Sequence, residues 1–531
     1  MAVSSLSLTG PWLVGAITSA CSSGFLLFGY DQGVMSGVVL SPSWLAAMDH
    51  PSELVIGTIT ALYDAGAVVG ALLAALTGDR LGRKRTLLLG ALLVVVGGCW
   101  MSLAFGRTDF MIARVLVGIG IGYTTSVTPV YQSEISGSGE RGWQVCCQLT
   151  TMLGGLLLAY CVNYGFYDAG RSGGLGAGGE WRLPLGLQCV FAVYILVLTP
   201  FLPDTPRWYL KNDETTDRGV EVLARLRGRD KEDDEVQKEV DEILSAIEES
   251  KREEEQTDWR GLLRADDNKR SDKRFYLAVG IQFMQQMSGI NIVTYYAPTL
   301  YTSTLRMSQQ DALLLGCFTQ LWYVLASFVT WYTIDRVGRR RLLVSMALGM
   351  CLVLVGEAVS IAVAGRSKIG AVAAVIFVFL FEACFTWGWM ACVWIYPPEI
   401  LPLKIRAKGS ALAAAADFVG NFIVVEVTPW GIARMGWKFY IIWAVFNLVN
   451  AVVVWLFYPE TGGLTLEAVD RVFNEEMEDN GEAQGFERLQ WAPVRVAAQA
   501  VKKVRRRNVW RNDEMGADES ERGLLDTDEL E

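Results

Sequence analysis

Histidine is nearly absent from this chain: among 531 residues the only one is His50. Imidazole is the commonest metal ligand and the usual acid–base group near neutral pH. The sequence also contains no nucleophile–base constellation, phosphate-binding loop or metal-ligand spacing. We therefore expect no enzyme, no metal site and no cofactor, and we interpret His50 as a solvated loop residue. The ten cysteines lie in or beside apolar runs, where they are expected to be packing residues rather than a disulfide framework.

Long apolar runs, in contrast, fill the sequence, which is 52% hydrophobic with a mean hydropathy of +0.28. A helix needs about 20 apolar residues to cross a bilayer. The runs therefore predict an all-α membrane protein with twelve transmembrane helices. The first run is not a cleavable signal, because no basic segment precedes it and Asp31 lies at its far end. The predicted spans are 12–35, 54–77, 86–105, 109–131, 144–163, 183–202, 274–299, 310–333, 341–363, 370–396, 408–428 and 437–458.

Basic residues gather in three short loops, 78–85, 334–341 and 404–408. These loops fall on one side of the membrane if the twelve helices alternate in direction. Lysine and arginine in short loops mark the cytoplasmic side. We therefore expect a multi-pass protein of the plasma membrane with both termini in the cytoplasm.

The two halves of the chain repeat three short patterns in the same order. Asp79-Arg80-Leu81-Gly82-Arg83-Lys84 recurs as Asp335-Arg336-Val337-Gly338-Arg339-Arg340, 256 residues later. Glu134 and Glu399 are each followed seven residues later by an arginine, and Pro203-Asp204-Thr205 recurs as Pro459-Glu460-Thr461. Because each half holds an even number of helices, the repeats are expected to be parallel and related by an axis along the membrane normal.

The repeats and the charge distribution predict four parts. These are a six-helix half at 1–206, a cytoplasmic connector at 207–273, a second six-helix half at 274–462 and a cytoplasmic tail at 463–531. The connector should contain an amphipathic helix, since Val236, Val240, Ile243, Leu244 and Ile247 have helical spacing. The basic cluster of the tail near Trp510 is compatible with binding to an anionic leaflet and equally with disorder.

The ordered motifs of residues 12–474 resemble those of the sugar porter family of the major facilitator superfamily. The resemblance implies the major facilitator fold, two six-helix halves that alternate in access around a central site. The opening Gly29-Tyr30-Asp31-Gln32-Gly33-Val34 is similar to fungal members. Besides the repeated loops, the resemblance rests on Arg114 followed by Gly118, Gly120 and Gly122, on Pro129-x-Tyr131-x-x-Glu134, Glu140-Arg141-Gly142, Trp181-Arg182-x-Pro184 with Gln188, Gln285-Gln286-x-x-Gly289-Ile290-Asn291 and Pro459-Glu460-Thr461-Gly462-Gly463-Leu464.

Neutral amides and indoles suit a sugar, because amides both donate and accept hydrogen bonds and an indole offers a flat apolar face. On an ideal helix Gln286 and Asn291 are about 140° apart, so a break near Gly289 is expected to re-aim them. Asp417-Phe418, Thr319-Gln320, Ala391 and Val393 depart from the family pattern, so glucose specificity does not follow. The positions that match sugar-binding positions of the family are Gln148, Gln285, Gln286, Asn291, Trp394 and Asn421.

Ionisable residues inside a membrane are functional candidates because their burial is costly. Asp31 and Arg114 match the acid and the arginine of proton-coupled sugar porters, which implies that Asp31 binds the coupled proton in competition with Arg114. The alternative is a permanent ion pair in a facilitator. Five further acids have no evident basic partner: Asp64, Glu357, Glu382, Asp417 and Glu426.

Charged residues at the cytoplasmic ends of the helices are predicted to form one network beneath each half. The networks are expected to act as a latch that holds the halves together when the site faces outward. The alternative is that these residues only orient the helices. The first network would contain Arg83, Glu134 and Arg141, and the second would contain Arg339, Glu399 and Arg406.

The sequence thus favours transport of a sugar or polyol by alternating access, coupled to proton symport. The expected partners are that small molecule, protons and the lipid bilayer, with no nucleic acid. Two alternatives stay open, a transporter-like sugar sensor that uses the long tail and a carrier of sugar acids or cyclic acids. The second alternative would favour additional cations near the site.

Overall fold

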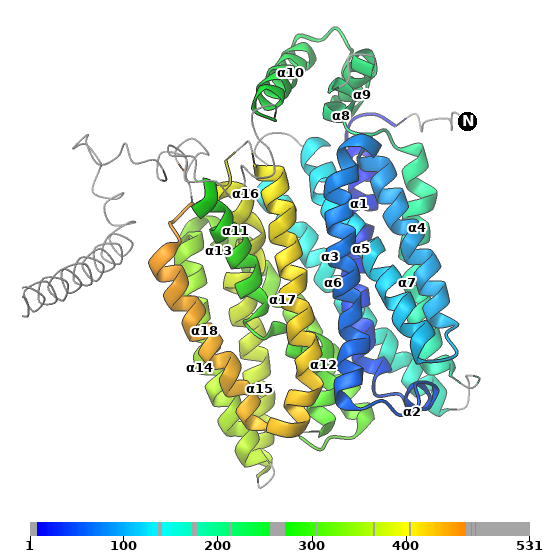
Figure 1. The fold of residues 1–531 in the computed structure, drawn as a ribbon, viewed down its shortest axis with the longest axis vertical. Coiled ribbons are helices and arrows are strands. Elements are labelled where there is room, and N and C mark those ends of the chain that lie inside the picture. The colour runs from blue at the N-terminus through cyan, green and yellow to red at the C-terminus, as the bar shows by residue number, and fades with distance from the viewer. Residues whose placement is uncertain are drawn as a thin grey trace, which may run out of the picture.

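The computed structural model is a bundle of long helices with a small group of helices at one end (Figure 1). We call the end with this group the connector end and the opposite one the far end. All regular structure among the described residues is helical. The structure describes residues 8–135, 141–172, 176, 178–211, 215–254, 271–303, 305–364, 367–402 and 405–462, together with 469 and 473.

The first half contains six spanning helices, as predicted. A short helix, α2 (Pro42–Ala47), follows the first of them at the far end (Figure 1). The spanning helices are α1 (Pro11–Val38), α3 (Glu53–Leu81), α4 (Arg83–Ser102), α5 (Arg107–Ile135), α6 (Arg141–Arg171) and α7 (Gly179–Leu198).

The second half also contains six spans, two of which are interrupted. The seventh span of the chain consists of α11 (Ser271–Gln286) and α12 (Ile290–Ser303). The tenth span consists of α15 (Lys368–Phe385), the π-helical turn η4 (Thr386–Met390) and α16 (Ala391–Ile400). The others are α13 (Gln309–Val337), α14 (Arg339–Ala364), α17 (Arg406–Met435) and α18 (Trp437–Phe457).

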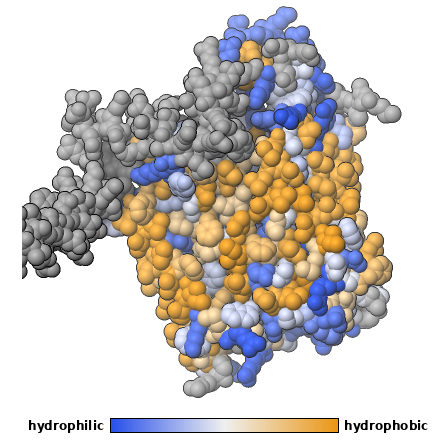
Figure 2. Space-filling view, in the orientation of Figure 1, coloured by the Kyte–Doolittle hydropathy of each residue, from blue (hydrophilic) through white to orange (hydrophobic). Residues whose placement is uncertain are grey.

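The twelve predicted spans are therefore confirmed. Eleven helical segments of the described chain are long and apolar enough to cross a bilayer. The remaining span is α11–α12, whose pieces of 16 and 14 residues are each too short to cross alone. Figure 2 shows an apolar band across the face in view, with hydrophilic residues towards the far end and in the connector. Leu352 on α14 and Val197 on α7 are examples of exposed apolar residues on the spanning helices.

The predicted break in the seventh span is confirmed at Gly289, whose φ is +87°. A residue with a side chain would be strained there, and a Cβ would lie 3.1 Å from the ring of Trp443. Because the helix restarts at Ile290, Asn291 is turned back towards Gln286, and its amide donates a hydrogen bond to the Gln286 Oε1.

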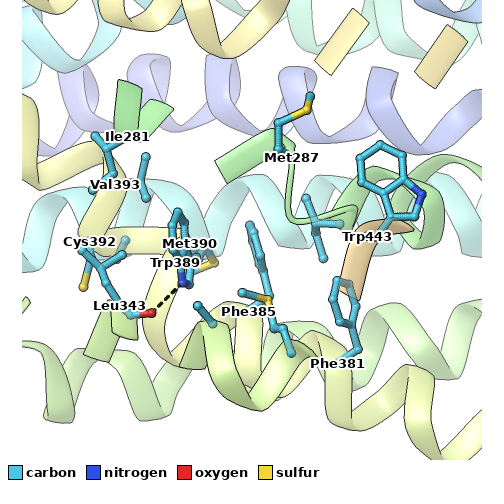
Figure 3. Close-up of a cluster of buried hydrophobic side chains, with 14 of the residues drawn as sticks. Ile281, Met287, Leu343, Phe381, Phe385, Trp389, Met390, Cys392, Val393 and Trp443 are labelled. Carbon is cyan, nitrogen blue, oxygen red and sulfur yellow. Dashed lines mark hydrogen bonds between the residues drawn. The ribbon is translucent and has the colours of Figure 1, made fainter. Parts of the chain in front are cut away.

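Small residues bring the helices of each half together. A Cβ on Gly118 of α5 would lie 2.0 Å from the backbone oxygen of Tyr63 on α3, so only glycine permits this approach. In the second half the core gathers around η4, where Phe385, Trp389 and Met390 are buried (Figure 3). The Trp389 indole donates a 2.9 Å hydrogen bond to the backbone oxygen of Leu343.

The predicted amphipathic helix of the connector is confirmed as α10 (Asp234–Glu254), which follows α8 (Pro206–Leu210) and α9 (Thr216–Arg227). Buried Val236, Val240 and Ile247 pack in one apolar cluster with residues of the two preceding helices. The backbone N–H of Gly10 donates to the Arg225 carbonyl at 2.6 Å, which places the start of α1 at the connector end. The predictions for the tail fall outside the described residues, apart from buried Val469 and Phe473.

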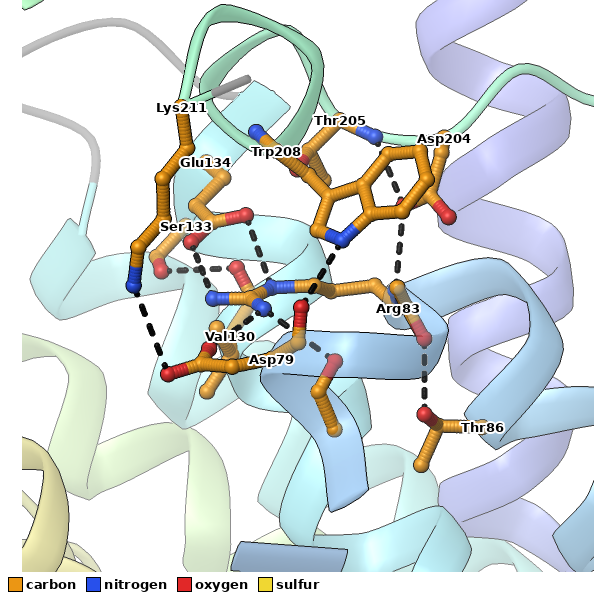
Figure 4. Close-up of polar contacts among 12 residues, drawn as sticks. Asp79, Arg83, Thr86, Val130, Ser133, Glu134, Asp204, Thr205, Trp208 and Lys211 are labelled. Atoms are coloured by element: carbon orange, nitrogen blue, oxygen red, sulfur yellow. Dashed lines mark hydrogen bonds and ion pairs between the residues drawn. The ribbon is translucent and has the colours of Figure 1, made fainter. Parts of the chain in front are cut away.

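The sequence repeat is also a structural repeat, and Figure 4 shows its copy in the first half. The Asp204 carboxylate accepts hydrogen bonds from the backbone N–H groups of Arg83 and Lys84 at 3.0 and 3.3 Å. The Glu460 carboxylate accepts from the N–H groups of Arg339 and Arg340 at 2.7 and 3.0 Å. Each acid therefore caps the first turn of a helix, α4 or α14, and satisfies N–H groups that have no partner within that helix.

Candidate functional site

Asp31 on α1 and Arg114 on α5 form a fully buried ion pair. One guanidinium nitrogen of Arg114 lies 3.3 and 3.4 Å from the two Asp31 carboxylate oxygens. Its other terminal nitrogen donates to the Thr60 carbonyl at 2.9 Å, and the guanidinium lies 4.9 Å from the ring centre of Tyr63. Close pairs of this type are about 2.7–2.9 Å long, so the contact between Asp31 and Arg114 is loose.

Asp64 on α3 lies beside this pair, which the sequence did not reveal. Its carboxylate is fully buried and is within electrostatic reach of Arg114 and Asp31. One oxygen accepts a 2.8 Å hydrogen bond from the amide of Asn421, which also reaches the Tyr295 hydroxyl at 3.2 Å. Since α3 and α17 belong to different halves, this hydrogen bond joins the halves in the middle of the bundle.

A second buried chain of hydrogen bonds joins the amides of the broken span to α17. The Gln286 amide donates to the Asp417 carboxylate at 2.6 Å, and Asn291 donates to Gln286 in turn. Each of these side chains is hydrogen-bonded to another side chain. A substrate hydroxyl could replace either partner, because a hydroxyl both donates and accepts hydrogen bonds. Asp417 was noted in the sequence only as a departure from the family pattern, and the structure makes it part of this chain.

The other predicted substrate-binding residues are not members of this chain among the described residues. Gln285 donates to the Trp389 backbone oxygen at 3.0 Å and so contacts the π-helical turn. Gln148 is buried on α6, and Trp394 is half-buried on α16. Among the described residues the structure therefore brings Gln286 and Asn291 together, while Asn421 bonds to Asp64.

The remaining intramembrane acids are in two different settings. Glu426 accepts a 2.7 Å hydrogen bond from the Thr58 hydroxyl, which joins α17 to α3 nearer the far end. Glu357 on α14 and Glu382 on α15 are buried, and neither carboxyl has a hydrogen-bond partner among the described residues.

One ion pair from each of the two predicted charge networks is present at the connector end. Arg83 pairs with Glu134 at 2.9 Å and with Asp79 at 2.9 Å (Figure 4). Arg339 pairs with Glu399 at 3.3 Å. These ion pairs join α4 to α3 and α5, and α14 to α16. Arg406 donates to the Leu401 carbonyl at 3.2 Å, and the side chain of Arg141 lies outside the described residues.

The cap of α4 belongs to the same end of the molecule. Burial raises the pKa of the Asp204 carboxyl above its usual range, although the backbone N–H groups of Thr205, Arg83 and Lys84 favour the charged form. The hydroxyl of Tyr131 donates to the neighbouring Pro203 carbonyl. The equivalent Tyr396 donates to the Pro459 carbonyl at 2.8 Å, so the contact recurs in the second half.

The family follows from a comparison with known proteins, because residues 16–473 match the family model described as "Sugar (and other) transporter". The chain belongs to the sugar porter family of the major facilitator superfamily. This sugar porter is accordingly a membrane transporter, and its relatives are transporters rather than enzymes.

Relatives of this sugar porter extend over most of its length. The MFS-type transporter oryC of Aspergillus oryzae is 34% identical over 473 residues, which cover 88% of this chain and 86% of that protein. The sugar transporter STL1 of Saccharomyces cerevisiae is 32% identical over 490 residues, which cover 89% and 83%. The quinate permease of Neurospora terricola is 29% identical over 483 residues, which cover 87% and 89%.

Solved structures agree with the fold of this sugar porter. The proton:xylose symporter XylE bound to 6-bromo-6-deoxy-D-glucose superimposes with a TM-score of 0.72 at 26% identity, over 87% of this chain and 99% of that protein. An inward-open structure of the xylose transporter XylE from E. coli gives a TM-score of 0.69 at 26% identity, over 86% and 99%. The predicted major facilitator fold is thereby confirmed.

Proposed function

We propose that this sugar porter carries a neutral sugar or polyol across the membrane by alternating access, driven by proton symport. The observation that supports this most directly is the position of a loose, buried Asp31–Arg114 pair beside an amide that joins the two halves. A group that changes charge and a group that contacts both halves are the two requirements of coupled transport.

The substrate assignment rests on the chemistry of the buried chain Asp417–Gln286–Asn291. Sugar hydroxyls donate and accept, so they can take the place of these mutual hydrogen bonds without leaving a buried polar atom unpaired. In this proposal Gln148, Gln285, Trp394 and Asn421 complete the binding set. The names of relatives agree: one is a sugar transporter and another a proton:xylose symporter solved with a halogenated sugar bound.

Proton coupling is proposed for Asp31. When its carboxyl takes up a proton, its attraction to Arg114 is lost and the pair separates. The available driving force is adequate, because a membrane potential of 100 mV supplies about 2.3 kcal/mol per charge. Two pH units add about 2.7 kcal/mol at roughly 1.36 kcal/mol per unit.

Alternating access needs contacts at both ends that can form in turn. At the far end the halves meet through Gln309, which donates to the Leu40 carbonyl at 2.9 Å, and through Thr58 and Glu426. Towards the connector end they meet where the hydroxyls of Thr150 and Ser327 lie 3.0 Å apart. The networks around Arg83 and Arg339 are proposed to control closure at this end, which we assign to the cytoplasm of a plasma-membrane protein.

A carrier of sugar acids or cyclic acids is the second candidate, because a quinate permease is among the relatives. A carboxylate substrate would need a cation in the site. Arg114 is the buried cation described there, and its two terminal nitrogens already donate to Asp31 and Thr60. The charge of the site therefore favours a neutral substrate.

Uptake by a transporter-deficient host tests the proposal. Cells expressing the full chain are given labelled hexoses, pentoses, disaccharides, polyols and quinate, each with and without a protonophore. The proposal expects a neutral sugar or polyol to accumulate and the protonophore to abolish accumulation. Uptake of quinate alone would overturn the substrate assignment, and accumulation that survives the protonophore would overturn proton coupling. Deleting residues 480–531 should leave uptake intact, whereas a sensor that depends on its tail would lose its response.

A further inference from the structure

We infer that Asp64 is a second carboxyl of the coupling site. Arg114 alternates between Asp31 and Asp64, and the hydrogen bond from Asn421 to Asp64 transmits this change to the opposite half. The inference rests on the proposed function and adds a positioning residue to it. The sequence assigned neither a partner nor a role to Asp64.

The first step of the argument is that the polar atoms around Arg114 are incompletely matched. Arg114 holds Asp31 at 3.3 Å, and its Nε has no hydrogen-bond partner among the described residues. The second carboxylate oxygen of Asp64 also has none in that part of the chain, although Asp64 is fully buried. A buried donor and a buried acceptor without partners are costly. A shift of Arg114 towards Asp64 would give both atoms a partner.

The second step concerns charge. One guanidinium faces two carboxyls here, so full ionisation would leave a net negative charge in a site without exposed atoms. Buried charge that lacks a partner is strongly unfavourable, and neighbouring acids then share protons. Asp31 and Asp64 are therefore expected to hold one proton between them, and Arg114 lies nearer the acid that is charged. The other groups close to Asp64 are Tyr63 from α3, Tyr295 and Tyr296 from α12, and Asn421 and Asp417 from α17.

The third step is the link to the second half. Asn421 donates to Asp64 at 2.8 Å, and its own side-chain oxygen has no partner among the described residues. This oxygen is available to accept a hydrogen bond from a substrate hydroxyl. When Asp31 binds a proton, Arg114 moves to Asp64 and the proton of Asp64 is released. Asp64 is then charged and holds the Asn421 amide more strongly, which fixes that oxygen for the substrate. When Arg114 returns, the proton on Asp31 passes to Asp64, so each cycle moves one proton through the pair.

The variant Asp64→Asn tests the inference, because it keeps the shape and the hydrogen-bonding capacity of the side chain but removes its charge. Without the charge of Asp64, Arg114 pairs only with Asp31, so Asp31 becomes protonated only at a lower pH. We expect the pH at half-maximal uptake to move down by about one unit. Exchange of labelled for unlabelled substrate at acid pH should persist. The probe is labelled D-glucose, D-xylose or glycerol, whichever the wild type takes up fastest.

Glu426→Gln is the matched control. Glu426 also joins α3 to α17, through the Thr58 hydroxyl, but it has no contact with Arg114. Glu426→Gln weakens a far-end contact and is expected to change the rate of uptake, but the pH at half-maximal uptake should equal that of the wild type. If the pH at half-maximal uptake is also unchanged in Asp64→Asn, Arg114 does not alternate between Asp31 and Asp64 and the inference is overturned.

A measurement without transport separates this inference from the proposed function. The unfolding temperature of the purified full chain is recorded against pH for the wild type, Asp64→Asn and Asp31→Asn. The inference expects the acid-dependent step of the wild type to move to lower pH in Asp64→Asn and likewise in Asp31→Asn, because the remaining acid then has Arg114 to itself. Superimposed curves for the wild type and Asp64→Asn overturn it even if none of the three probes is transported. A shifted curve together with uptake that is independent of protons would overturn the proposed coupling alone.

If Asp64→Asn does not fold, the pH dependence of uptake by Asn421→Leu tests the same inference. This change removes the hydrogen bond to Asp64 as well as the proposed contact with substrate. A residue that only binds substrate would raise KM and leave the pH midpoint unchanged. The inference expects the midpoint to shift as well, and an unchanged midpoint would contradict it.

Discussion

Asp204 lies beside the first turn of α4 and accepts a 3.0 Å hydrogen bond from the backbone N–H of Arg83. Glu460 makes the same contact with Arg339 at 2.7 Å in the second half. In both places a glycine with positive φ precedes the capped helix, Gly82 at 85° and Gly338 at 94°. The acid and the glycine form one unit, because a Cβ on Gly82 would lie 2.2 Å from an Asp204 carboxylate oxygen.

These caps should stabilise the two halves separately. Replacing Asp204 by Asn keeps one acceptor but loses the second, so we expect a loss of about 1–2 kcal/mol in the free energy of unfolding. Glu460→Gln should cost a similar amount. Because the caps lie in different halves, the double variant should lose the sum of the two.

Thermal or denaturant unfolding in detergent measures these losses. Glu232→Gln is the control, since Glu232 is exposed in the connector and caps no helix. A double variant no less stable than either single variant would show that the two caps do not act independently.

The fold could be predicted because its signals are local. Apolar runs of sufficient length give the spans, and Gly289 between two amide-bearing segments gives the break. The repeat gave the parallel arrangement of the halves. The turn η4 was not predicted, since Trp389 and Met390 occupy positions that an ordinary helix would accept as well.

The candidate site could be predicted only in part. The sequence determines how deep Asp31 and Arg114 lie in the membrane, because each residue of a helix adds about 1.5 Å along its axis. It does not fix how a helix is rotated against its neighbours. For that reason Asp64 looked unpaired, whereas packing of α3 against α5 brings it near Arg114. The same rotation directs Gln285 to a backbone oxygen and Gln286 to Asp417.

Gly289→Ala should destabilise the broken span. The alanine would have to adopt a φ of +87°, and its Cβ would approach the Trp443 ring at 3.1 Å. Such backbone strain costs about 1–3 kcal/mol. The yield of folded protein and its unfolding temperature should both fall.

Gly154→Ala is the matched control. Gly154 lies within α6 and a Cβ added there has open space around it. Alanine should be tolerated or slightly stabilising at this position. Equal effects of the two substitutions would contradict the special role of Gly289.

Gln286 is expected to contribute directly to the affinity for substrate. Gln286→Leu removes a side chain that bonds to Asp417 and leaves that buried acid without its donor. If a substrate hydroxyl uses the same groups, KM should rise about 10–100-fold, since losing a hydrogen bond to a charged group costs about 1.5–3 kcal/mol. The KM of labelled substrate uptake measures this change.

Gln282→Leu serves as the control for that comparison. Gln282 lies on the same helix and donates to the Val393 backbone oxygen at 3.3 Å, outside the chain of Asp417 and Asn291. Its replacement should affect folding more than KM. A KM for Gln286→Leu equal to that of the wild type would remove Gln286 from the proposed substrate site.

The charge network around Glu399 can be tested as a latch. Glu399→Gln weakens the 3.3 Å ion pair with Arg339, and we expect the connector end to open about fivefold more often, as for a change of about 1 kcal/mol. The readout is labelling of Ser327→Cys, a buried position where α13 meets α6 of the other half. Glu235→Gln is the control, because its 2.8 Å pair with Arg229 lies in the exposed connector. Unchanged labelling would leave the basic residues with an orienting role only.

Asp31→Asn should separate accumulation from movement. The asparagine cannot take up a proton, so no proton can displace Arg114 at this position and the proton exchange with Asp64 stops. We expect the ratio of internal to external substrate to fall to about one, because the proton gradient then performs no work on the substrate. Exchange of labelled for unlabelled substrate across the membrane should continue, since it requires no net proton movement. Uptake measured at several external pH values distinguishes the two outcomes: a variant that still concentrates substrate with the pH dependence of the wild type would show that the coupled proton binds elsewhere.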